Sequence, residues 1–140
     1  MEFLEDAKRQ FGELILSELQ RIERMKESGA PKDFSKLEKI VVGVMPGDGI
    51  GPIIMKQALR VLETLMKPEI ESGKLEIRHI EGMTIENRAA LLQSLPDSVL
   101  EQVKQCDVLL KGPMVTPRAG DPWPNLISAN SMLRRSLDLY

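Results

Sequence analysis

A chain of 140 residues fits one ordinary domain with a modest core. Its 42% hydrophobic and 29% charged residues are typical of a globular protein and argue against overall disorder. The formal net charge of −2 offers no concentrated basic face, so nucleic acid is not an expected partner.

The composition also argues against secretion and membrane insertion. The first residues mix acids into an apolar stretch, unlike a signal peptide, and no apolar segment is long enough to span a membrane. Cys106 is the single cysteine, so no intrachain disulfide can form, and we interpret it as a small buried residue at a helix end. A cytoplasmic protein is the expectation.

The first predicted element is a helix over about residues 3–27. Apolar residues recur there at spacings of three and four and form one stripe: Leu4, Ala7, Phe11, Leu14, Ile15, Leu19, Ile22 and Met25. The other face mixes acids and bases, which favours a packing surface or an intersubunit seam over a membrane-surface helix. Gly29-Ala30-Pro31 ends the helix, so we assign residues 1–30 to an N-terminal amphipathic extension and residues 38–140 to a second domain.

The second domain opens with a strand, a tight turn and a helix. Lys39–Met45 is a β-branched apolar run suited to a strand buried on both faces. Three glycines permit unusual backbone conformations in the turn at 46–52, and Pro52 suits the first turn of a helix. That helix is predicted to end near Lys67-Pro68.

Further strands and helices alternate along the rest of the chain. Strands are predicted over Lys74–Ile80 and Asp107–Lys111, and helices over Arg88–Ser94 and from Pro96 onward. This alternation indicates an α/β fold with a mostly parallel sheet flanked by helices. His79, the only histidine, is interpreted as a packed or half-exposed strand residue.

Ligands of open α/β sheets bind beyond the carboxyl ends of the strands, which places the expected site at loops 46–52 and 111–127. The glycines of the first loop are spaced as GxGxG, which is neither a dinucleotide-binding fingerprint nor a phosphate-binding P-loop. Taken alone, this loop is equally well explained as a structural turn.

Four segments in order resemble the isocitrate/isopropylmalate dehydrogenase family, the decarboxylating β-hydroxyacid dehydrogenases. They are Met45–Pro52, Leu95–Asp97, Asp107–Pro113 with Thr116-Pro117, and Ser128–Tyr140. The resemblance covers about residues 39–140 and implies a partial isopropylmalate-dehydrogenase-like fold, whereas the N-terminal helix is not part of the shared pattern. Ile53 replaces an acid that is usual in the family, and Val115 stands where some members have a threonine.

The resemblance implies an oxidative decarboxylase that uses NAD or NADP and Mg²⁺ or Mn²⁺. Arg134 matches the first arginine of the family's substrate clamp, and a guanidinium pairs bidentately with a carboxylate. Ser128 and Asn130 match the isocitrate type, where a hydroxyl and an amide bind an additional carboxylate, so an isocitrate-like substrate is favoured. A helix cap is the alternative role of Ser128. Ile50 and Thr116 are implied as contacts near the nicotinamide end of the cofactor.

Family members are more than twice this length, so we expect the catalytic tyrosine and lysine, the metal-binding aspartates and further clamp arginines to be missing. The chain alone is then expected to have negligible activity. The alternative is a non-catalytic paralogue that acts as an oligomerisation or partner-binding module. Expected associations are a homo-oligomer or a complex with a dehydrogenase subunit.

Overall fold

The computed structural model describes residues 2–27 and 32–139. It divides into two units, Met1–Ser35 and Lys36–Tyr140, each of which is described by itself. The predicted helix stop at Gly29-Ala30-Pro31 lies outside the described residues.

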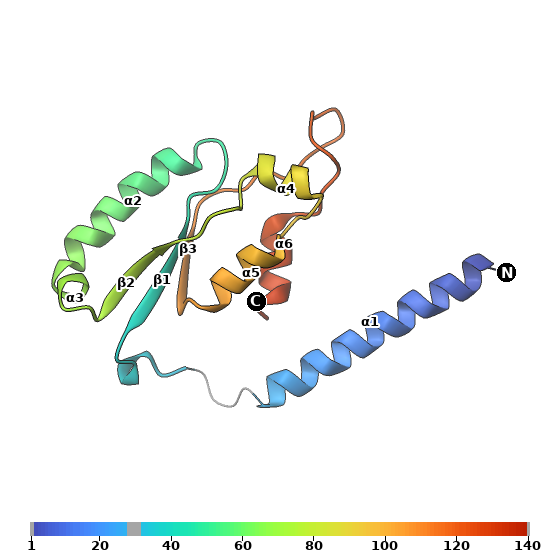
Figure 1. The fold of residues 1–140 in the computed structure, drawn as a ribbon, viewed down its shortest axis with the longest axis horizontal. Coiled ribbons are helices and arrows are strands. Elements are labelled where there is room, and N and C mark those ends of the chain that lie inside the picture. Colours follow the sequence, from blue (N-terminus) through green and yellow to red (C-terminus); the bar gives the residue numbers. More distant parts are fainter. Residues whose placement is uncertain (1, 28–31, 140) are drawn as a thin grey trace. The chain divides into compact units, whose positions relative to one another are not determined.

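The first unit is built on helix α1, Glu2–Glu27 (Figure 1). Ion pairs at helical spacing line its polar side, among them Lys8–Glu5 at 2.8 Å and Arg9–Glu13 at 3.0 Å. Such pairs stabilise an exposed helix by a few tenths of a kcal/mol each, roughly 0.2–0.5. A single 3₁₀ turn, η1 (Phe34–Lys36), follows it. None of the described helices is long and apolar enough to cross a membrane.

The second unit contains a three-stranded parallel sheet of β1 (Ile40–Met45), β2 (Leu75–His79) and β3 (Val108–Lys111). The order is β2-β1-β3, and Val42 of the central strand lies opposite Ile77 on one side and Val108 on the other. Helices connect the strands, so the predicted α/β class with a parallel sheet is confirmed.

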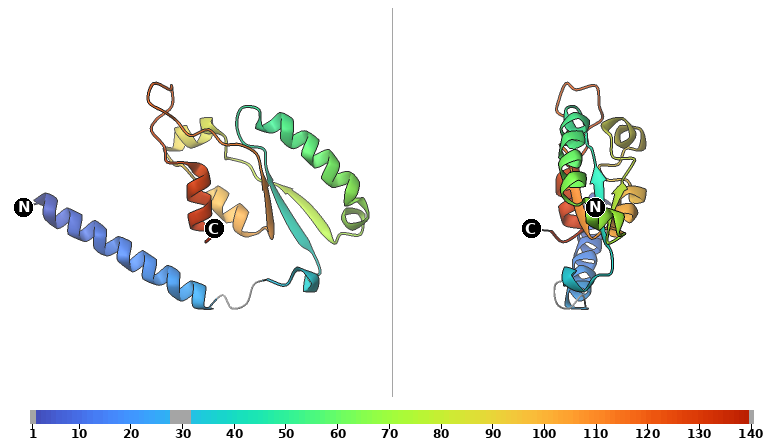
Figure 2. Two further views of the ribbon diagram at one scale, coloured as in Figure 1. Left: turned by 180° about the vertical axis from the view of Figure 1, so that it is seen from behind. Right: turned by 90° about the vertical axis from the view of Figure 1, so that its left-hand side faces the viewer.

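Helices cover both faces of this sheet (Figures 1 and 2). On one face α2 (Gly51–Leu65) and α3 (Lys67–Glu71) pack on Val42 and Val44. On the other, α5 (Asp97–Lys104) and α6 (Ala129–Ser136) build a second apolar cluster. The buried members of that cluster are Met45, Ile80, Met83, Leu95, Val99, Val103, Ala129 and Leu133. The central strand is therefore covered on both faces, as its apolar run predicted.

Helix α4 (Ile85–Leu91) begins three residues earlier than the predicted Arg88–Ser94. The Asn87 backbone N–H donates to Thr84 Oγ1, so Thr84 caps the helix, and Leu92 ends it in a left-handed conformation at φ 54°. The predicted end of the second helix near Lys67-Pro68 is also corrected. Helix α2 ends at Leu65, and Pro68 is accommodated in the first turn of α3, where its missing N–H costs no hydrogen bond.

Candidate functional site

The loops that follow β1 and β3 lie side by side at the carboxyl ends of the strands. Gly112 N–H donates to the carbonyl of Met45, and Asp48 N–H donates to the carbonyl of Pro113, both at 2.8 Å. These bonds continue the pairing of β1 with β3 beyond the sheet. The two loops expected to form a ligand site are thus one connected surface.

Two glycines permit this close approach. A Cβ on Gly47, whose φ is +81°, would lie 2.0 Å from the Pro113 carbonyl oxygen. A Cβ on Gly112 would lie 2.0 Å from the Pro46 carbonyl oxygen. Both neighbours are backbone atoms that cannot rotate away, so any side chain here would separate the loops.

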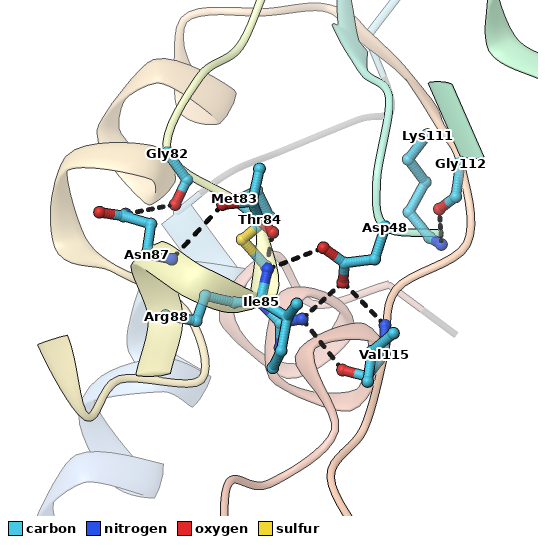
Figure 3. Close-up of polar contacts among 10 residues, drawn as sticks. All are labelled: Asp48, Gly82, Met83, Thr84, Ile85, Asn87, Arg88, Lys111, Gly112 and Val115. Atoms are coloured by element: carbon cyan, nitrogen blue, oxygen red, sulfur yellow. Dashed lines mark hydrogen bonds and ion pairs between the residues drawn. The ribbon is translucent and has the colours of Figure 1, made fainter. Parts of the chain in front are cut away.

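An ion pair buried between these loops and α4 fixes their arrangement (Figure 3). Asp48 lies in the first loop, and its carboxylate accepts bonds from Arg88 Nη2 at 2.7 Å and from the backbone N–H groups of Ile85 (2.7 Å) and Val115 (2.8 Å). Its side chain is 4% exposed and that of Arg88 is 0% exposed. Three charge-assisted bonds therefore join the first loop, the start of α4 and the loop after β3.

Arg88 makes further contacts through its guanidinium. Nη2 also donates to the Val115 carbonyl at 2.9 Å, and Nε donates to the Met83 carbonyl at 3.2 Å. Nη1 is buried and has no hydrogen-bond partner among the described residues. Since Asp48 and Arg88 both point inward, they position the loops and are not exposed to a ligand.

The pair was missed by the sequence interpretation, which treated Asp48 only as part of a glycine-rich turn and Arg88 as the start of a helix. The sequence feature that could have indicated a buried carboxylate was an acid between two glycines in the turn that follows a buried strand. No local pattern identified its partner forty residues away.

The three predicted substrate residues lie on or next to α6, whose first turn is at the end of the unit where the strands end (Figure 1). Ser131 N–H donates to Ser128 Oγ at 3.4 Å, so Ser128 is the helix cap. Asn130 is half-buried, and its Oδ1 is buried without a hydrogen-bond partner in the part of the chain described. Arg134 lies one turn later and is exposed. The i, i+4 spacing places Asn130 and Arg134 on one side of the helix.

The two predicted cofactor contacts lie in the paired loops. Ile50 precedes α2 and is 63% exposed, and Thr116 follows β3 and is also exposed. No contact joins their side chains directly among the described interactions. Backbone pairing of their loops brings both to the same edge of the sheet.

A cavity of about 430 Å³ opens at this edge, between the first turn and the segment after β2. Its lining is mostly apolar: Met45, Pro46, Gly47, Pro52, Ile80, Glu81, Gly82, Met83 and Thr84. It contains none of Ser128, Asn130 and Arg134. The cavity and the α6 side chains are therefore separate features.

Burial also shifts the pKa of two ionisable groups, Lys111 at the carboxyl end of β3 and Cys106 before the start of β3. Desolvation lowers the pKa of Lys111, whose Nζ donates to the Gly112 carbonyl at 2.9 Å (Figure 3). Desolvation raises the pKa of the Cys106 thiol, which is half-buried against the α5–α6 cluster. Its thiol is therefore protonated at neutral pH, which argues against a reactive role. His79, the last residue of β2, is exposed, so the interpretation of this histidine as packed or half-exposed is corrected.

A divalent metal needs several oxygen ligands. Within residues 2–27 and 32–139, no group of three or more His, Cys, Asp or Glu side chains comes together to hold one. The carboxylate of Asp48 is already satisfied by three donors. The described residues thus do not fit a complete metal site.

The sequence model of the family described as isocitrate/isopropylmalate dehydrogenase matches residues 41–140. The chain is 34% identical over 104 residues to the 3-isopropylmalate dehydrogenase of Carboxydothermus hydrogenoformans, a match that covers 69% of this chain and 26% of that protein. It is 32% identical over 101 residues to the NADP isocitrate dehydrogenase of Thermus thermophilus (71% and 18%). A mitochondrial NAD isocitrate dehydrogenase regulatory subunit 2 of Arabidopsis thaliana is 31% identical over 99 residues (71% and 23%).

The chain spans between 18% and 26% of the length of these curated relatives. No solved structure matches it. The matched region begins at residue 41, so α1 lies before it.

Proposed function

Since this chain belongs to the isocitrate/isopropylmalate dehydrogenase family, we propose that it forms the N-terminal segment of an NAD(P)-dependent oxidative decarboxylase of isocitrate-like 2-hydroxy acids. In this proposal Ser128, Asn130 and Arg134 bind the substrate, and Ile50 and Thr116 contact the cofactor. The segment contributes binding groups, and the chain alone has negligible catalytic activity.

The observation that supports the substrate role is the unsatisfied amide of Asn130. A buried acceptor without a partner costs about 1–3 kcal/mol, and a ligand donor such as a substrate hydroxyl would remove that cost. The amide nitrogen can donate to a carboxylate at the same time. Arg134, one turn along, supplies the exposed cation that a polycarboxylate needs.

NAD or NADP supplies the hydride acceptor in such a reaction. The paired loops offer Ile50 as an exposed apolar surface and Thr116 as an exposed hydroxyl. Mg²⁺ or Mn²⁺ would have to be bound mainly by groups that the described residues do not provide. We therefore assign no residue of this chain to the metal.

We also propose that the chain functions in the cytoplasm and in an assembly, either with itself or with a dehydrogenase subunit. A single cysteine suits a reducing compartment. One similar protein is named as a regulatory subunit, which favours association with other chains. The exposed stripe of α1 favours the second candidate function, a non-catalytic association module.

The substrate proposal is tested by thermal unfolding of the full chain with and without isocitrate. A ligand that binds the native state raises the unfolding temperature, and we expect Arg134→Ala to lose most of that increase. Arg135→Ala is the matched control, because Arg135 is also exposed but one position further around the helix. An equal increase in both variants, or none in the wild-type chain, would contradict the assignment.

A further inference from the structure

Helix α1 has an apolar surface that the family resemblance does not account for. It precedes the matched region. Leu4 is 56% exposed, Phe11 65%, Ile15 44% and Ile22 44%. A row of large exposed apolar side chains marks an interaction surface.

The spacing of this surface is that of a coiled-coil seam. Steps of four and three residues alternate without a break through seven positions: Leu4, Lys8, Phe11, Ile15, Glu18, Ile22 and Met25. Five of them are apolar and two are charged. The seam therefore has two charged positions, and these discriminate between possible partners.

Lys8 and Glu18 determine the favoured orientation. In a parallel pair of identical helices, Lys8 would face Lys8 and Glu18 would face Glu18, which places like charges together twice. In an antiparallel pair with its two-fold axis at residue 13, Lys8 of each copy faces Glu18 of the other. The same axis places Leu4 opposite Ile22 and Phe11 opposite Ile15. Each pair of facing side chains forms one layer of the seam, so the charged layers join an acid to a base and the remaining layers join two apolar side chains.

We propose that α1 binds a second copy of this chain as an antiparallel helix pair in which Lys8 and Glu18 form two symmetric interchain ion pairs. Within one chain Lys8 bonds Glu5 at 2.8 Å and Glu18 bonds Arg21 at 2.6 Å. The Lys8 side chain is 61% exposed and that of Glu18 45%, so both remain accessible to the second copy. The pairing rests on the proposed assembly of the chain with itself and makes it specific. It is independent of the proposed dehydrogenase function, since it uses no residue of the matched region.

The test is sedimentation of the full chain and two charge-reversal variants over a range of concentrations. Lys8→Glu would bring two acids face to face in each charged layer, and Glu18→Lys would bring two bases face to face there. We expect each variant alone to dimerise at least about tenfold more weakly than the wild-type chain. An equimolar mixture of the two should form a heterodimer, because each mismatched chain then faces its complement.

Arg9→Glu and Glu13→Lys are the matched controls. They make the same charge changes and break the Arg9–Glu13 pair at 3.0 Å, but both positions lie on the outer side of the helix, away from the seam. We expect them to leave dimerisation unchanged and to show no preferential association when mixed.

Several results would overturn the proposal. A wild-type chain that stays monomeric has no such pair. Equal effects of Lys8→Glu and Arg9→Glu would mean that only net charge or helix stability matters. The Lys8→Glu variant could also pair preferentially with the wild-type chain. That result would indicate a parallel arrangement instead, because in a parallel pair Lys8 of the wild-type chain faces the new acid at the same position.

Discussion

At the scale of single residues, the Asp48–Arg88 pair is the most buried polar feature of the sheet unit. Asp48 accepts two backbone N–H groups besides the guanidinium, and Arg88 donates to two carbonyls besides the carboxylate. The pair therefore connects three segments that sequence separates widely. Its role is to position the loops that carry Ile50 and Thr116.

Removing one member of the pair should be strongly destabilising. We expect Arg88→Met to lower the free energy of unfolding by about 3–5 kcal/mol, because it leaves a buried carboxylate without its cation. Urea unfolding at neutral pH measures the loss. The double variant Asp48→Asn/Arg88→Met removes both charges and should lose less than the sum of the two single variants. Additive losses would mean that the pair is not coupled.

At the scale of elements, the first turn and the loop after β3 form one surface because their backbones touch. Sequence spacing predicted the turn and the strand before it, and it predicted that ligands would bind near both loops. The contact itself depends on the register of β1 with β3, in which Met45 lies opposite Lys111. The start of α4 was predicted at the wrong residue because its caps, Thr84 and Leu92, do not form a sequence pattern that identifies the ends of a helix.

The loop contact predicts unequal effects of two glycine substitutions. Gly112→Ala should destabilise the sheet unit by roughly 1–3 kcal/mol or more, since the new Cβ would overlap the Pro46 carbonyl. Gly49→Ala in the same first turn meets open space and carries only the strain of φ +57°, about 1–2 kcal/mol. Chemical unfolding compares the stabilities of the two variants. Only Gly112→Ala should also speed the hydrogen exchange of the Asp48 amide, because it disrupts the bond from Asp48 N–H to the Pro113 carbonyl. Equal losses with unchanged amide exchange would contradict this account.

At the scale of the whole molecule, the chain consists of two units that differ in kind. The sheet unit has two apolar clusters of its own, one on each face of β1. The first unit is a helix with exposed apolar side chains and no buried hydrophobic residue among those described. The sheet unit thus has a hydrophobic core formed from its own residues.

Deletion of residues 1–35 should separate assembly from folding. We expect the remaining chain to keep its helical and strand circular dichroism and cooperative unfolding, and to sediment as a monomer. Loss of cooperative unfolding would show that α1 contributes to the core. A dimer that persists after the deletion would place the interface in the sheet unit.

The sequence by itself determined the class of fold, the positions of the three strands along the chain and the family, because these depend on local periodicity and on motifs read along the chain. The β-branched run of β1 and the amphipathic α1 are both local patterns. Only the tertiary structure decided which polar groups are buried. The burial of Asp48 against Arg88 and the unsatisfied Asn130 Oδ1 depend on segments far apart in sequence, and desolvation there depends on packing that no local pattern encodes.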